Sequence, residues 1–208
     1  MCLVIHAPTD LRLDEQDAGE IGPGQVLVRV GMGGICGSDL HYFHDGGFGT
    51  VRIKEPLILG HEVAGTVAAV AADVTSVKVG DRVAVNPSRP CKACKFCLEG
   101  LPNQCLEMRF YGSAMRMPHV QGAFRNALVC NANQCVKVAD GVPLQLAALA
   151  EPFSVGLHAV SRAASMALWA YMGIESAAVS AGVIENPRRN VPLATLIVCV
   201  LGAILFGL

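Results

Sequence analysis

Four closely spaced cysteines are the clearest chemical feature of the sequence. Cys91, Cys94, Cys97 and Cys105 follow the spacing C-x2-C-x2-C-x7-C in a loop that contains Pro, Lys and Asn. Four thiolates this close together can surround one tetrahedral zinc ion and leave no coordination position open, which is typical of a structural site. An iron–sulfur cluster and four unrelated cysteines are the alternatives. The spacing predicts a structural zinc lobe over residues 86–110.

A second set of candidate ligands is scattered over three stretches. These are Cys-Gly-Ser-Asp-Leu-His at 36–41, Gly-His-Glu-Val-Ala-Gly at 60–65 and Ala-Glu-Pro at 150–152. A catalytic zinc needs about three protein ligands and one exchangeable position, so a thiolate, an imidazole and a carboxylate from separate loops would suffice. A lone Cys or His is more often structural, and Glu-Pro often starts a helix. Spacing alone therefore does not assign this site.

The elements that would position these ligands are mainly short β-strands. Residues 25–30, 63–70 and 81–85 are rich in β-branched and apolar residues, and Gly22-Pro23-Gly24 marks a turn before the first of them. Frequent glycines punctuate this part of the chain, which favours an all-β or β-rich barrel over alternating βα units. A short helix is predicted over 152–163, with Pro152 in its first turn. The predicted fold is mainly β with short helices.

Composition narrows the function classes. The 208-residue chain has a formal net charge of −1 and no long basic run, so nothing indicates a nucleic-acid partner. Met1 to Arg12 shows no basic leader followed by an apolar stretch, so we expect no cleaved signal peptide. The nine cysteines then suggest a reducing, cytoplasmic compartment, where thiols act as metal ligands or core residues rather than disulfides.

The composition changes abruptly after Ala163. Two apolar runs, 164–183 and 191–208, flank the polar stretch 185–190, and the second run contains no charged residue. Eighteen helical residues reach about 27 Å, close to the thickness of a hydrocarbon core. The pattern predicts an apolar helical hairpin over 164–208 with possible membrane association and the arginines on the cytoplasmic side. Buried helices of a soluble domain are the alternative.

Taken together, these motifs resemble the zinc-containing medium-chain dehydrogenases. The Cys-Gly-Ser-Asp-x-His stretch, the Gly-His-Glu-x-x-Gly stretch and the four-cysteine lobe resemble the sorbitol and polyol branch, and 86–91 with 108–115 are similar to L-idonate 5-dehydrogenases. The resemblance covers residues 1–163 and implies a GroES-like barrel that acts as the catalytic domain. It also implies two zinc ions per chain, one catalytic and one structural, and NAD or NADP as cosubstrate.

The resemblance also assigns roles to individual residues. It implies that Cys36, His61 and Glu151 bind the catalytic zinc, with Glu62 as a close carboxylate that binds directly or through water. A bound zinc would lower the pKa of a substrate hydroxyl before hydride leaves for nicotinamide.

Two further residues fall where the family relays a proton. The resemblance implies that Ser38 and His41 pass the substrate's hydroxyl proton to solvent. Asp39 either bonds a ligand histidine or serves the start of a helix. The implied reaction oxidises a secondary alcohol of a polyol or sugar acid, L-idonate to 5-ketogluconate being the nearest case.

The Rossmann domain that the resemblance implies after residue 163 is missing from the sequence. No Gly-x-Gly-x-x-Gly turn follows a strand there, so no cofactor-binding residues are predicted, and Gly31 to Gly34 is interpreted as close backbone packing. Instead, 168–176 and 185–195 resemble membrane helices of basic amino acid antiporters of the arginine/agmatine type. We therefore expect a truncated dehydrogenase fused to a transporter fragment, a chimera inactive alone. The alternatives are a non-catalytic zinc-binding module and a membrane-inserted fragment.

Overall fold

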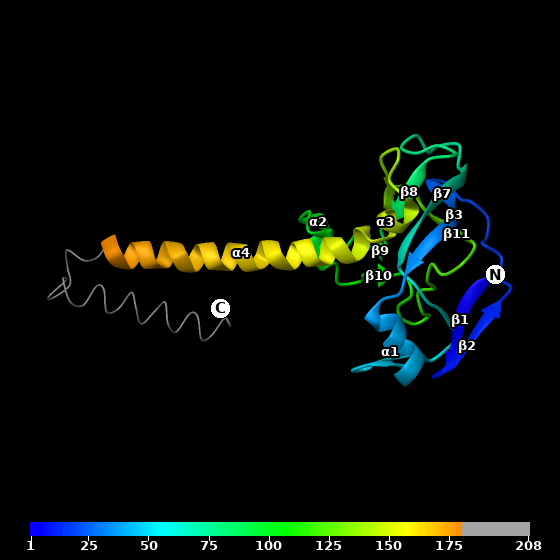
Figure 1. Cartoon of the computed structure of the whole chain (residues 1–208), viewed down its shortest axis with the longest axis horizontal. Coiled ribbons are helices and arrows are strands. Elements are labelled where there is room, and N and C mark those ends of the chain that lie inside the picture. Colours follow the sequence, from blue (N-terminus) through cyan, green and yellow to red (C-terminus); the bar gives the residue numbers. More distant parts are fainter. Residues whose placement is uncertain (180–208) are drawn as a thin grey trace. The chain divides into compact units, whose positions relative to one another are not determined.

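The fold up to Phe153 is built mainly of β-strands, as predicted. A computed structural model describes residues 1–179, with side chains described through Met166 (Figure 1). Residue contacts divide the chain into one unit, Met1–Phe153, and a second that begins at Ser154. The strands are β1 Cys2–Ala7, β2 Asp10–Asp14, β3 Gln25–Gly34, β4 Gly47–Phe48, β5 Val51–Arg52, β6 Leu57–Ile58, β7 Glu62–Val70, β8 Arg82–Val85, β9 Ser88–Arg89, β10 Arg109–Phe110, β11 Ala127–Asn131 and β12 Cys135–Lys137. The helices are α1 Gly37–Asp45, α2 Lys95–Leu98, α3 Leu144–Ala148 and α4 Ala150–Val179, with 3-10 turns η1 Pro102–Gln104 and η2 Ala132–Gln134.

A five-stranded antiparallel sheet is the frame of this unit. Its strand order is β11-β3-β7-β8-β12, and Figure 1 shows β11, β3, β7 and β8 side by side. The three strands expected from the sequence are β3, β7 and β8, so those predictions are confirmed. Smaller sheets, β2-β1-β6, β4-β5 and β9-β10, surround the frame.

Valine side chains fill the core against this sheet. Val26, Val28, Val67 and Val83 are each at most 1% exposed and belong to one apolar cluster. Burying such a side chain contributes roughly 1.5–3 kcal/mol relative to leaving it in water. β-Branched residues also suit the pleated backbone, because their restricted χ1 costs little there. The sheet is therefore a stiff base for residues at its strand ends.

Helix α1 follows β3 directly and is fixed at both ends. Cys36 is its N-cap, and the Asp39 carboxylate accepts a hydrogen bond from the Cys36 backbone N–H at 3.0 Å. Gly46 ends the helix in the left-handed region with φ 69°, which glycine adopts without a Cβ clash. Tyr42 buries the inner face and accepts a hydrogen bond from the Ala114 N–H at 3.0 Å.

The helix predicted for 152–163 is longer than expected. The structure has a helix, α4, from Ala150 to Val179, so the predicted end at Ala163 is wrong and residues 164–179 of the first apolar run continue the same helix. Among the residues described, no helix is both long and apolar enough to cross a bilayer. The second apolar run, 191–208, and the polar stretch 185–190 lie outside the described residues, and with them the predicted hairpin.

Candidate metal sites

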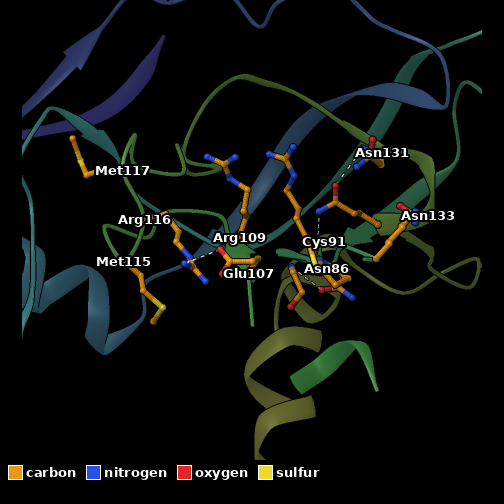
Figure 2. Close-up of a pocket in the computed structure, with 14 residues that line it drawn as sticks. Asn86, Cys91, Glu107, Arg109, Met115, Arg116, Met117, Asn131 and Asn133 are labelled. Carbon is orange, nitrogen blue, oxygen red and sulfur yellow. Dashed lines mark hydrogen bonds and ion pairs between the residues drawn. The ribbon is translucent and has the colours of Figure 1, made fainter. Parts of the chain in front are cut away.

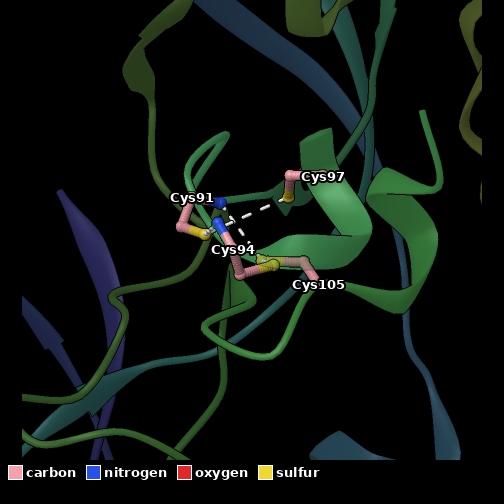
Figure 3. A group of neighbouring side chains, drawn as sticks. All are labelled: Cys91, Cys94, Cys97 and Cys105. Carbon is pink, nitrogen blue, oxygen red and sulfur yellow. Dashed lines mark hydrogen bonds between the residues drawn. The ribbon is translucent and has the colours of Figure 1, made fainter. Parts of the chain in front are cut away.

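The structure brings the four predicted cysteines of the lobe together. The sulfur atoms of Cys91, Cys94, Cys97 and Cys105 all lie within 4.8 Å of one another (Figure 3). The Cys91 and Cys97 sulfurs are 4.0 Å apart, as are those of Cys94 and Cys105. Four sulfurs converging on one point form the ligand set of a closed, tetrahedral metal site.

Backbone N–H groups in the lobe already favour thiolates. The backbone N–H groups of Cys97 and Leu106 lower the pKa of Cys94 to about 6. The N–H groups of Ala93 and Cys94 likewise lower the pKa of Cys91. Burial raises the pKa of Cys97 to about 12, and hydrogen bonding to Cys94 adds to this rise. The lobe therefore stabilises negative sulfur at two positions, which suits a metal cation at its centre.

Little apolar packing holds the lobe together. Its regular elements are α2, η1 and the two-residue strands β9 and β10. Of the four cysteines only Cys105 is buried, and none belongs to an apolar cluster of the described residues. Small units without a core commonly depend on a metal for their folded state. The sulfur set fits zinc in both chemistry and position.

A second cluster joins three of the residues that the resemblance assigned to a catalytic zinc. One ligand atom each of Cys36, His61 and Glu62 lies within 4.8 Å of the other two. Cys36 lies between β3 and α1, and Glu62 begins β7, where it pairs with Gly34 at the end of β3. Sheet register therefore brings together residues that are far apart in the sequence.

His61 has the surroundings of a ligand rather than of an ordinary core histidine. The residue is 6% exposed, and its Nδ1 atom is buried without a hydrogen-bond partner among the described residues. A buried polar atom left unpaired costs roughly 1–3 kcal/mol. A thiol and a carboxylate lie beside the ring, so this donor set fits a cation that would satisfy the site.

The Glu62 carboxylate fits a space that only glycine leaves open. A Cβ added at Gly34 would lie 2.2 Å from Glu62 Oε2, and one added at Gly33 would lie 2.8 Å from the Phe124 ring. The close backbone packing expected for Gly31 to Gly34 is thus confirmed at these two positions. The glycines hold Glu62, itself 7% exposed, against the strand end.

Asp39 connects the two segments that carry Cys36 and His61. One carboxylate oxygen accepts the Cys36 N–H at 3.0 Å, and the other accepts the Gly60 N–H at 3.1 Å. Of the two roles expected for Asp39, the structure shows the helix N-terminal one and adds the bond to Gly60. Because Asp39 is 3% exposed, these bonds are shielded from water.

Glu151 lies near the cluster at the start of α4. Burial raises the pKa of Glu151, the charge of His61 lowers it, and the charge of Glu62 raises it. Both neighbours thus influence this carboxyl electrostatically, although its oxygens are not within the 4.8 Å group formed by Cys36, His61 and Glu62.

The two residues expected to relay a proton both lie on α1. Ser38 is partly buried, and the His41 side chain is 60% exposed, with its Nδ1 3.5 Å from Asp45 Oδ2. No hydrogen bond between Ser38 and His41 occurs in the described part of the chain.

Two phenylalanines, Phe110 and Phe124, lie beside the cluster and are not predicted from the sequence. The Phe110 ring centroid lies 5.3 Å from that of His61. Phe124 packs against Gly60, where an added Cβ would approach its ring to 2.2 Å. Neither phenylalanine carries a chemical group that marks it as part of a site. Only the fold reveals that β10 runs past His61.

Comparison with known proteins establishes the family. Residues 22–140, more than half of the chain, match the family described as the alcohol dehydrogenase GroES-like domain. The chain belongs to this family. It is therefore a zinc-type medium-chain dehydrogenase relative, as the resemblance implied.

Individual relatives include polyol and sugar-acid dehydrogenases. The chain is 45% identical over 141 residues to L-idonate 5-dehydrogenase (NAD(P)(+)) of Escherichia coli, covering 68% of this chain and 40% of that protein. It is 40% identical over 159 residues to sorbitol dehydrogenase of Bacillus subtilis, covering 76% and 44%. The crystal structure of the E. coli L-idonate 5-dehydrogenase aligns with a TM-score of 0.72 at 41% identity, covering 76% and 45%. The chain thus spans less than half the length of these relatives.

Proposed function

We propose that this chain is a zinc-binding, substrate-handling half of a polyol or sugar-acid dehydrogenase. The single observation that carries this proposal is the convergence of Cys36, His61 and Glu62, a cluster in which the buried His61 ring has an unpaired Nδ1. The structural zinc would be held by the four cysteines of the lobe, as a separate site. Two zinc ions per chain would follow, with Glu151 supplying a further carboxylate to the buried cluster.

Each residue of the cluster would have a separate role in binding the metal and the alcohol. When bound, zinc supplies a Lewis acid that lowers the pKa of an alcohol hydroxyl. Cys36 and His61 would hold the ion, and the Glu62 and Glu151 carboxylates would ligate it or orient the hydroxyl. Phe110 would exclude water from the His61 side of the site, because its ring packs on that imidazole.

The proton would leave along α1. Ser38 lies two residues after Cys36 and is partly buried, so it would accept the hydroxyl proton near the cluster. His41, with its side chain 60% exposed, would release that proton to solvent. The substrate class proposed is a polyol or sugar acid such as L-idonate, with NAD or NADP as hydride acceptor.

Residues 1–208 would not support turnover by themselves. They contain no Gly-x-Gly-x-x-Gly turn that would hold a nicotinamide beside the alcohol. Positioning two reactants can supply about 7–11 kcal/mol of rate enhancement, which would be lost without a dinucleotide site. This observation favours a second candidate function, a zinc-binding module that performs no catalysis. A chimera with an antiporter fragment would account for the apolar residues after 163.

Cobalt substitution of the purified chain tests the proposal. We expect about two metal ions per chain, with cobalt spectra that report thiolate ligation at both clusters. L-Idonate or sorbitol should alter the spectrum of the buried cluster, and His61→Ala should abolish that change while the lobe signal persists. Reduction of added NAD or NADP is assayed in parallel. A buried cluster that binds no metal would overturn the proposal, and metal binding without any response to substrate would favour the non-catalytic module.

A further inference from the structure

A basic groove is lined in large part by residues of the four-cysteine lobe. It has a volume of about 820 Å³ and is lined by residues of β9 and β10 and the loops around them (Figure 2). Its charged lining consists of four cationic side chains and a single carboxylate, namely Arg89, Lys92, Arg109, Arg116 and Glu107. We call it the arginine groove. Its polar, positively charged lining suits an anionic ligand rather than an apolar one.

Two of the arginines face each other across a strand pair. Arg89 of β9 and Arg109 of β10 are register partners, so their side chains project from the same face of this ribbon. Side chains in such a pair start about 4.5–5.5 Å apart at Cβ, and like charges there repel each other. Both also line a smaller cavity of about 290 Å³, to which Arg125 adds another cation.

No carboxylate of the described residues neutralises the repulsion between Arg89 and Arg109. Glu107 pairs with Arg116, their charged atoms lying 2.9 Å apart. The Arg89 guanidinium lies 5.8 Å from the centre of the Tyr111 ring, a contact that keeps its charge. Among the side chains described through Met166, no carboxylate forms an ion pair with Arg89 or Arg109. An anion between these two guanidinium groups would relieve the repulsion.

We propose that the arginine groove binds a phosphorylated small molecule, with its phosphoryl group between Arg89 and Arg109. Each guanidinium presents a planar fork of donors that matches phosphate oxygens two at a time. One arginine satisfies both oxygens of a carboxylate, whereas a phosphoryl group has a third terminal oxygen for the second arginine. The groove volume lies in the range of small-molecule sites, so it holds more than the phosphoryl group alone.

The groove is distinct from the buried metal cluster. None of Cys36, His61 and Glu62 lines the groove, and in β10 Phe110 packs on His61 while Arg109 lines the groove. A ligand in the groove would therefore not occupy the position of the proposed alcohol substrate. Cys91 also lines the groove, so the competing role for these arginines is to offset the charge of metal-bound thiolates.

Calorimetric titration of the full zinc-loaded chain tests this proposal. Inorganic phosphate and succinate are titrated at constant ionic strength, each into wild type and four variants. We expect saturable phosphate binding that is tighter than succinate binding. Arg89→Gln and Arg109→Gln should each weaken it about tenfold, the usual value of a hydrogen bond to a charged group. The phosphate affinity of Arg109→Lys should lie between those of wild type and Arg109→Gln, because lysine keeps the charge but loses the planar pair of guanidinium donors.

The matched control is Arg52→Gln. Arg52 is likewise exposed and lies in a two-stranded sheet, but outside the groove, so phosphate affinity should not change. Equal affinity in all variants, absent saturation or preference for succinate would overturn the proposal. Zinc content is measured for every variant. Zinc loss from Arg109→Gln with unchanged phosphate affinity would instead show that the arginines serve the thiolates. If Arg109→Gln does not fold, the phosphate affinity of Arg109→Lys relative to wild type tests the proposal instead.

Discussion

The two metal-ligand clusters are assembled in opposite ways. The lobe draws all its ligands from 91–105, on short elements outside any apolar cluster of the described residues. The buried cluster draws its ligands from residues 36, 61 and 62, which meet because β3 and β7 pair along their length. The lobe is thus local in sequence and poorly packed, whereas the buried cluster is distant in sequence and rigidly framed.

This difference predicts two kinds of dependence on metal. A lobe without a core depends on metal binding for its ordered structure, because few buried contacts offset the chain entropy lost on folding. A cluster fixed by a sheet keeps its shape without metal and offers a preformed site. Changes in the lobe should therefore alter folding, and changes around the buried cluster should alter affinity.

The largest effect is expected from Cys94→Ser. Structural zinc sites contribute roughly 10–16 kcal/mol of binding free energy in zinc-finger peptides, so losing one ligand should disorder residues 86–110. Hydrogen exchange of this segment should lose its protection, while the β3 and β7 amides keep theirs. Metal analysis should show one zinc instead of about two. Removing zinc from wild type with a chelator should reproduce the pattern, and a lobe that stayed protected would remove the proposed contrast.

The next largest effect is expected from Gly34→Ala. The added Cβ would lie 2.2 Å from Glu62 Oε2 and 3.2 Å from Glu62 Cβ, so the flexible carboxylate should move away from the cluster. Zinc affinity there should fall about 10–100-fold, with little loss of stability. Competition against a chromogenic chelator measures the affinity. Gly37→Ala is the matched control, because an added Cβ there meets nothing within 4 Å. Equal affinities of the two variants would contradict the argument.

A smaller effect is expected from Asp39→Asn. The amide group can accept at only one end, so either the Cys36 or the Gly60 N–H loses its partner. The free energy of unfolding should fall by about 1–2 kcal/mol, and zinc affinity at the buried cluster should fall with it. Urea unfolding and zinc competition measure both. Asp45→Asn, exposed on the same helix, should change neither. A loss of stability without a loss of affinity would show that Asp39 does not position the ligands.

The same contrast explains what the sequence could reveal. The four cysteines were predictable because their spacing alone sets their proximity, and the strands β3, β7 and β8 because β-branched residues mark them. The buried cluster followed only from resemblance to a family, since nothing local indicates that Glu62 pairs with Gly34. The contact of Phe110 with His61 and the facing of Arg89 and Arg109 depend on strand register, which composition does not encode. The length of α4 was missed because the change in composition at residue 164 does not interrupt its helical pattern.

The smallest effect is expected at the frame itself, from Asp81→Asn. The Lys78 N–H and then the Lys137 ammonium, 3.2 Å away, hold the pKa of Asp81 below its usual value. A lowered pKa in the folded state stabilises the protein above the unfolded pKa, near 3.9, and this contribution is lost as the pH falls through the lowered value. Thermal unfolding should therefore separate wild type from variant at pH 7, and the difference should vanish in acid. Asp140→Asn, at an exposed turn, should show no such difference.

Zinc content at pH 7 should be unchanged at both clusters, because the sheet that frames the buried one depends on its valine core rather than on this surface ion pair. Loss of zinc from the buried cluster alone would show that its frame is less rigid than the packing of β3, β7 and β8 indicates.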